Sequence, residues 1–205
     1  MQLAPGAYRL AAVPFLIGVV AGVAFPPAAV VGALLGVGTL VFFRDPDRTP
    51  PERGILSPAD GTVSVIREEK TNSGTRLRVG VFMNVWHVHV NRAPAGGEVV
   101  DRSHEPGGHR PAFSKDAEAN ERVRLRIDAD SVEYELVQIA GAFARRISPY
   151  VDPGDEVGRG DRIGHIAFGS RVDVLFPPAV TRPDLAVDEG DAVRAGETVL
   201  AREAR

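Results

Sequence analysis

The chain has 205 residues, 44% of them hydrophobic and 25% charged, which suits one well-filled domain plus an additional segment and excludes two full-sized domains. It contains no cysteine, which excludes disulfide scaffolds, thiolate nucleophiles and cysteine-ligated zinc. A net charge of -3 argues against nucleic acid as a partner, and the scarcity of lysine, present at Lys70 and Lys115, disfavours chemistry based on a lysine amine.

The first predicted element is an apolar segment over residues 10–43 that carries no charged residue. Pro26-Pro27 divides it into two halves, each somewhat shorter than the ~20 residues that a helix needs to cross a bilayer core. Two short helices turning at the prolines would keep Arg9 and Arg44 on one, cytoplasmic side of the membrane, whereas a shallower hairpin would lie in one leaflet. We expect residues 1–43 to anchor the chain in the cell membrane; a buried core hairpin is the alternative.

A charged, proline-rich linker is expected over residues 44–54, followed by a catalytic domain over 55–205 on the cytoplasmic side. Short runs such as "TVSVI", "RLRVGVF", "VRLRI" and "VEYELVQI" alternate between apolar and polar residues, which is typical of half-buried strands. A short helix is expected around "AGAFARRI" at 140–147. The predicted fold class is therefore mainly β (α+β), with an N-terminal hydrophobic helical hairpin.

An internal repeat occurs near the C-terminus, where "PGDEVGRGDRIGHI" at 153–166 matches "EGDAVRAGETVLAR" at 189–202. Gly-Asp pairs at matching positions indicate two equivalent hairpin turns, since glycine accepts positive φ and aspartate closes its own backbone turn. The pattern is typical of barrel-sandwich hairpins, as in carrier domains. A carrier function is disfavoured, because such domains present a modifiable lysine at a hairpin tip and these turns have none.

The segment "NVWHVHVNRAP" at 84–94 predicts a strand with one polar and one apolar face. The polar face would carry His87, His89 and Asn91. The apolar face would carry Trp86, Val88 and Val90. A His-x-His pair on a strand is also a zinc arrangement, so a membrane-tethered zinc hydrolase is an alternative function. A third ligand would then come from one of His104, His109 and Asp60.

Three further motifs carry candidate residues for chemistry, none of them decisive alone. "FGSR" places Gly169-Ser170 inside a strand pattern, where glycine usually marks a bulge or a close approach to the backbone. "SPADG" carries Asp60 in a tight turn, and "NERV" at 120–123 precedes another strand. Taken alone, Asp60 is better explained as a turn carboxylate, and the "NERV" cluster is explained by a solvated charge run before a strand.

Together, "SPADG", "HVHVNRAP", "NERV", "IAGAFARRI" and "GDRIGHIAFGSRVDVLFP" occur in an order that resembles the phosphatidylserine decarboxylase family in its short, membrane-tethered form. The resemblance covers about residues 41–178. It implies decarboxylation of phosphatidylserine or archaetidylserine to the ethanolamine phospholipid. The lipid tails, acyl or isoprenoid, stay open.

The resemblance also implies that the Gly169–Ser170 bond cuts itself, giving a β chain of residues 1–169 and an α chain of residues 170–205. Ser170 becomes a covalent pyruvoyl group, the cofactor that condenses with the serine amine of the lipid. His89 would be the base and Asp60 the carboxylate that orients it, and no metal is implied. Family precedent and exposed strand edges favour a homodimer.

The sequence departs from the family pattern at Trp86, where some members carry a second histidine three positions before the base. The proton donor in decarboxylation is therefore open. Candidate substrate-binding residues are His87, His104 and His109, the last two in a Gly-rich segment expected to form a mobile loop. Whether the head-group phosphate meets Arg92, Arg110 or neither stays open.

Overall fold

The computed structural model describes residues 2–71, 74–108, 110, 112, 119–129, 132–142, 147–167 and 169–202. These residues form two compact units, one ending at Asp47 and the other beginning at Arg48. The expected helix at 140–147 falls mostly on residues 143–146, which lie outside the described part. Ala140 to Ala142 are not helical and Ile147 begins a strand, so the described ends of that segment give the helix prediction no support.

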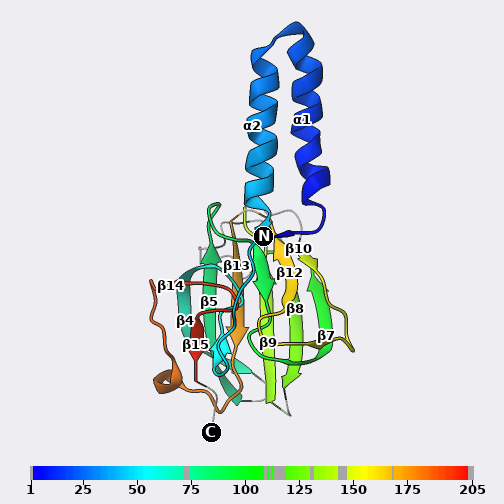
Figure 1. Cartoon of the computed structure of the whole chain (residues 1–205). Helices are drawn as coiled ribbons and strands as arrows, with labels where there is room; N and C mark the ends of the chain where they lie inside the picture. The colour runs from blue at the N-terminus through cyan, green and yellow to red at the C-terminus, as the bar shows by residue number, and fades with distance from the viewer. Residues whose placement is uncertain are drawn as a thin grey trace. The chain divides into compact units, whose positions relative to one another are not determined.

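The first unit is an antiparallel helical hairpin, formed by α1 (Ala7–Ala24) and α2 (Pro27–Phe42), as the two apolar halves predict (Figure 1). Two short strands, β1 (Gln2–Leu3) and β2 (Arg44–Asp45), pair antiparallel. The helices approach closely where Gly18 faces Gly32, since a Cβ on Gly18 would lie 2.7 Å from the Gly32 Cα. Small residues at a helix contact are typical of packing in lipid.

Helix α1 is long and apolar enough to cross a membrane, with a mean hydropathy of 1.8. Helix α2 is as apolar but shorter. Large apolar side chains are exposed along both helices, for example Val20 on α1 and Leu34 on α2. A surface of this kind is unusual for a hairpin in water and is typical of one in lipid.

The second unit is built on a curled antiparallel sheet of eight described strands, in the order β11-β7-β8-β9-β13-β5-β4-β14 (Figure 1). Their bounds are β4 (Gly61–Thr71), β5 (Gly74–Met83), β7 (Gly97–Glu105), β8 (Arg122–Ala129), β9 (Val132–Ile139), β11 (Glu156–Val157), β13 (Ser170–Leu175) and β14 (Ala192–Val193). The four alternating runs of the sequence therefore are strands, which confirms the mainly β fold. Strand β13 lies between β9 and β5.

One face of this sheet packs against shorter strands that close the apolar core. These are β6 (Val90–Arg92), β10 (Ile147–Pro149) and β12 (Arg162–Ile166) in one small sheet, and β3 (Ile55–Leu56) with β15 (Val199–Ala201) in another. A 3-10 turn, η2, spans Arg182–Asp184. Val172 and Val174 of β13 lie in the core with Ile163 and Ile166 of β12. Since side chains alternate along a strand, Ser170 belongs to the same, core-facing set.

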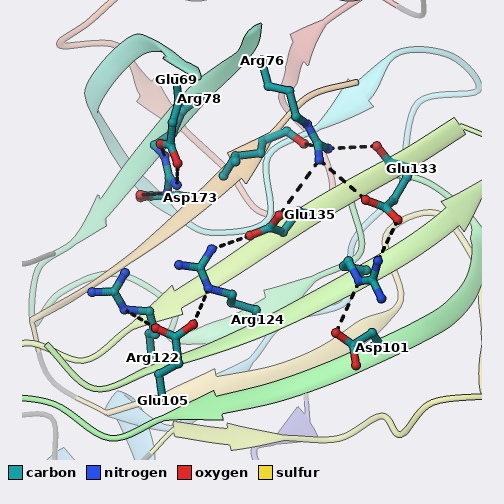
Figure 2. A network of polar contacts seen from close by, with 12 residues as sticks. Glu69, Arg76, Arg78, Asp101, Glu105, Arg122, Arg124, Glu133, Glu135 and Asp173 are labelled. Carbon is teal, nitrogen blue, oxygen red and sulfur yellow. Dashed lines mark hydrogen bonds and ion pairs between the residues drawn. The ribbon is translucent and has the colours of Figure 1, made fainter. Parts of the chain in front are cut away.

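The other face of the sheet carries a ladder of paired charges, shown in Figure 2. Arg124 bridges two strands, donating to Glu105 at 2.7 Å and to Glu135 at 2.6 Å. In a separate group on the same face, the fully buried Asp173 of β13 accepts a hydrogen bond from Arg78 at 2.8 Å. Arg78 also binds Glu69, and this hydrogen bond holds the pKa of the Glu69 carboxyl below its usual value.

The repeat expected near the C-terminus is present as two equivalent hairpin turns. Gly154 and Gly190 adopt nearly the same φ, +96° and +98°. In each turn an aspartate closes its own backbone: Asp155 accepts from the N–H of Asp152, and Asp191 from that of Asp188. The following short strands pair in the same way, β11 with the start of β7 and β14 with the start of β4. The barrel-sandwich-like hairpins are thus confirmed.

Candidate active site

The Gly169–Ser170 junction lies at the start of β13, in the interior of the large sheet. Ser170 pairs with Met83 of β5 and is fully buried. Gly169 has φ +59°, in the left-handed region where side chains other than glycine are strained. The chain therefore turns sharply at Gly169 before it enters the strand, which answers why a glycine interrupts this apolar pattern.

The Ser170 hydroxyl has no hydrogen-bond partner among the described residues, although it is buried. Such an unsatisfied group costs about 1–3 kcal/mol, and in a folded protein it is a sign of function. A serine whose hydroxyl is not held elsewhere can turn toward the carbonyl that precedes it.

Two buried amides lie beside Ser170. Gln138 of β9 is diagonal to it on the core-facing side of the sheet, since Val172 is the residue paired with Gln138. Its Nε2 donates to Asn91 Oδ1 at 2.8 Å, and Asn91 Nδ2 contacts the sulfur of Met83 at 3.6 Å. Sequence reasoning missed Gln138, although a glutamine at an apolar position of "VEYELVQI" was a detectable signal.

His89 is buried, 1% exposed, immediately before β6. Its carbonyl accepts from the N–H of Ile166 at 3.3 Å, which joins it to β12 four residues before Ser170. From the same stretch, Asn91 reaches Met83, the residue paired with Ser170. The structure therefore brings the backbone around His89 into the neighbourhood of the Gly169–Ser170 bond.

The expected strand over 84–94 is wrong in its first half, because β6 begins only at Val90. The cause is Asn84, whose side chain accepts from the N–H of Trp86 at 2.9 Å and forms a turn. His87 lies in that turn, where its Nδ1 accepts from the N–H of Asn84 at 3.1 Å. The polar face predicted for His87, His89 and Asn91 therefore does not form.

The same turn exposes two apolar side chains. Trp86 is 79% exposed and Val85 is 47% exposed. Among the described residues of the second unit, the other large apolar side chains that are exposed are Val100 and Val132, which stand singly. The turn thus presents a small apolar tip three residues from the buried His89.

Asp60 lies in the "SPADG" turn before β4, and its carboxylate is held by two groups. Arg48 donates to both oxygens, at 3.0 and 2.8 Å, and the N–H of Ala195 donates to Oδ1 at 2.8 Å. Arg48 also donates to Glu197 at 2.8 Å. The turn itself adjoins β6, since the N–H of Arg92 donates to the Pro58 carbonyl. The carboxylate is therefore fixed, with its charge compensated by a guanidinium.

The remaining sequence candidates lie apart from this cluster or outside the described residues. His104 is on strand β7 rather than in a mobile loop, and its Nε2 lies 3.0 Å from Glu121 Oε1. His109 lies outside the described residues. The Arg92 guanidinium is buried and donates to the Gly160 carbonyl at 2.9 Å, whereas Arg110 is exposed. In the described ranges, no three His, Asp or Glu side chains gather as metal ligands, and the zinc alternative gains no support.

His165 of β12 is a titratable group that sequence reasoning did not single out. It pairs with Val90 of β6, the residue after His89, and its Nδ1 lies 2.8 Å from the Tyr150 hydroxyl. Burial lowers the pKa of His165, because the protonated ring loses hydration. Burial thus disfavours the charged form of this ring, which lies against Tyr150.

Comparison with known proteins identifies the family of this chain. The sequence model of the phosphatidylserine decarboxylase family matches residues 37–201. A relative from Halobacterium salinarum, provisionally named archaetidylserine decarboxylase proenzyme, is 56% identical over 198 residues, covering 97% of each chain. The phosphatidylserine decarboxylase proenzyme of Streptomyces griseus is 47% identical over 183 residues, covering 89% of this chain and 80% of the relative. The chain belongs to the phosphatidylserine decarboxylase family.

Proposed function

We propose that this chain decarboxylates a serine phospholipid to the ethanolamine phospholipid, using a pyruvoyl group that it generates from Ser170. The observation that carries the proposal is the buried Ser170 hydroxyl, without a partner among the described residues, directly after Gly169 in a left-handed turn. The names of the relatives support the substrate class and a chain that is cut after synthesis. Phosphatidylserine and archaetidylserine share the serine head group, which is the reacting part.

In the proposed self-cleavage, the Ser170 oxygen attacks the Gly169 carbonyl carbon, the amide C–N bond breaks and an ester forms. Elimination then breaks the bond between Cβ and Oγ of residue 170, so that Gly169 leaves as a carboxylate and residue 170 becomes dehydroalanine. Water converts this enamine to the pyruvoyl carbonyl and releases ammonia. The products are a β chain of residues 1–169 and an α chain of residues 170–205.

We assign the base to His89 and its orienting carboxylate to Asp60. Burial of His89 next to the Ser170 region supports the first role, since a base must lie within reach of the hydroxyl proton. The position of Asp60 in a turn that adjoins β6 supports the second, although its described hydrogen bonds come from Arg48 and Ala195. A neutral imidazole accepts the hydroxyl proton, and a nearby anion favours the imidazolium that results.

The pyruvoyl group would supply the electron sink needed for loss of carbon dioxide from an amine-bearing substrate. The side chains of this lysine-poor chain offer no comparable electron sink. Asn91 and Gln138 are buried amides bonded to each other on the core-facing side of the sheet that also carries residue 170. Both offer hydrogen-bond groups to a polar head group in an otherwise apolar interior. They are therefore our candidates for orienting the bound serine.

A lipid substrate requires access from a membrane, and two features support that access. Helix α1 is apolar and long enough to span a bilayer, and the Val85–Trp86 tip presents an aromatic ring of the type found at membrane interfaces. Arg9 and Arg44 flank the helical hairpin, which supports a location of the catalytic unit on the cytoplasmic side of the cell membrane.

The test is decarboxylation by the purified full chain in vesicles that contain phosphatidylserine labelled in its carboxyl carbon. We expect labelled carbon dioxide and phosphatidylethanolamine, no turnover by Ser170→Ala, and wild-type turnover by Ser103→Ala, a serine of β7 remote in register from β13. Turnover by Ser170→Ala would overturn the pyruvoyl assignment. If the wild-type chain is inactive on phosphatidylserine, the same assay with archaetidylserine decides the substrate class.

A further inference from the structure

The carbonyl of Gly169, the group attacked in the proposed self-cleavage, lies directly against Gly141. A Cβ at position 141 would lie 1.6 Å from the Gly169 oxygen and 2.7 Å from its carbonyl carbon. Real Cβ atoms do not come within about 3.0 Å of such atoms. Position 141 therefore accepts glycine alone while the Gly169 carbonyl stays where it is.

Gly141 is itself held by its neighbour Ala140, whose two backbone groups are both bound. The N–H of Ala140 donates to the Glu121 carbonyl at 2.9 Å. The carbonyl of Ala140 accepts from Asn120 Nδ2 at 2.7 Å. The backbone that leads into Gly141 is thus held by two hydrogen bonds, one to the Glu121 carbonyl and one from the Asn120 side chain.

Asn120 is 1% exposed, and each of its polar atoms has a partner. Besides Ala140, its Nδ2 donates to the Arg110 carbonyl at 2.7 Å, and its Oδ1 accepts from the Arg110 N–H at 2.8 Å. A buried amide with this complete set of bonds is rigid. It therefore determines where Gly141 lies.

On the other side of the scissile bond, Ser170 is fixed by its place in β13, paired with Met83. Among the described residues, a Cβ on Gly169 would meet no atom within 4 Å. Within the described part of the chain, the position of the Gly169 carbonyl is thus limited by Gly141 and by the strand. A shift of about 1 Å in such a reacting group can cost about 100-fold in rate.

We propose that Asn120 and Gly141 are positioning residues for self-cleavage: Asn120 fixes the Ala140 peptide, and Gly141 leaves the space in which the Gly169 carbonyl is held for attack by Ser170. The inference rests on the proposed function. It gives a physical role to two motifs, "NERV" and "IAGAF", whose residues take no part in the chemistry itself. Glycine is required at 141 for a close approach, and at 169 for its positive φ.

The test is a time course of cleavage of the newly synthesised full chain, measured by intact mass. We expect Gly141→Ala to cleave about 100-fold or more slowly than wild type, and Asn120→Ala about tenfold or more slowly. Gly108→Ala is the matched control from the same region, because among the described residues a Cβ there would meet only the Ala119 carbonyl oxygen and Asn120 Oδ1, at the ordinary contact distances of 3.7 and 3.8 Å. We expect this control to cleave at the wild-type rate.

A second measurement separates positioning from general damage to the fold. The fraction of Gly141→Ala that does mature should decarboxylate at the wild-type rate per pyruvoyl group, because the cut bond no longer has to be held over Gly141. The uncleaved Gly141→Ala chain should also melt within a few degrees of uncleaved Ser170→Ala. If Gly141→Ala does not fold, the Asn120→Ala rate decides.

Cleavage of both Gly141→Ala and Asn120→Ala at the wild-type rate would overturn the inference and leave the proposed function standing. An equal loss of maturation and of activity per pyruvoyl group would also overturn it, in favour of a structural role. A wild-type chain that never cleaves would instead contradict the proposed function itself. The two failures are thus distinguished by the wild-type sample.

Discussion

Replacement of Asp60 by asparagine, compared with replacement of Arg48 by glutamine, separates a chemical from a structural role of the carboxylate. Both changes destroy the Arg48–Asp60 pair, in which the side chains are 8% and 13% exposed. Breaking a fully buried pair costs about 3–5 kcal/mol, so this partly buried one is worth about 2–4 kcal/mol. A domain with about 5–15 kcal/mol of stability stays mostly folded after that loss.

The cleavage rate should therefore respond very differently to the two changes. Arg48→Gln keeps the carboxylate, and we expect its maturation to stay within about tenfold of wild type, because the folded fraction barely changes. Asp60→Asn removes the anion that orients a catalytic histidine, a loss that costs about 10⁴-fold in a comparable triad. The assay is the fraction of newly synthesised chain cleaved against time, with melting temperatures to confirm that both variants fold.

Equal slowing in Asp60→Asn and Arg48→Gln would refute the reasoning, since Asp60 would then act through the ion pair and the fold. Wild-type maturation of Asp60→Asn would remove Asp60 from the site altogether. A large gap between the two variants is the result that the assignment requires.

Three other predictions concern stability, pH and the membrane. Asp173→Asn should lower the free energy of unfolding by about 3–5 kcal/mol, because it breaks a buried ion pair. The exposed Glu105→Gln should lower it by less than about 1 kcal/mol. Equal effects of the two changes in denaturant titrations would contradict the importance of the buried Asp173 pair. Because Arg78 lowers the pKa of Glu69, the Arg78–Glu69 pair contributes stability that is present above the unfolded-state pKa and is lost as pH falls through the folded-state pKa. Glu69→Gln should therefore make the denaturation midpoint depend less on pH in the acid range. An unchanged pH dependence would refute this. Trp86→Ser should raise KM for vesicle substrate several-fold with little change in kcat, whereas Val132→Ser, at the exposed first residue of β9, should leave KM unchanged. Identical KM values in the two variants would contradict a role of the Val85–Trp86 tip in binding the membrane.

Most of the fold was predictable because it depends on local patterns. Alternation of apolar and polar residues identified β4, β5, β8 and β9, and the Gly-Asp repeats identified the paired hairpins. The long apolar run with its central prolines predicted both helices of the hairpin. In each case the residues that decide the structure are close together in the sequence.

The parts that failed depend on single side chains or on distant segments. Period-2 reasoning extended the strand through residues 84–89, because it does not register that Asn84 closes a turn with its own side chain. The pairing of Asp60 with Arg48 was not visible either, since Asp60 lies in a turn and Arg48 in an irregular segment twelve residues before it. The contact of Gly141 with the Gly169 carbonyl joins segments that only the sheet order brings together.

The family motifs located Gly169 and Ser170, and the structure adds the physical state of that bond: a left-handed glycine before a buried serine hydroxyl with no partner in the described part of the chain. Motif order alone did not distinguish residues that react from residues that position. Asn120 and Gly141 belong to matched motifs, and their relation to the scissile bond is a matter of distance.

The most direct measurement is an intact-mass spectrum of the purified full chain, before and after borohydride reduction in the presence of an amine. The account predicts two fragments that divide between Gly169 and Ser170, with the smaller lighter than its sequence by one ammonia and able to trap the amine. A single uncut chain without an adduct would contradict the account.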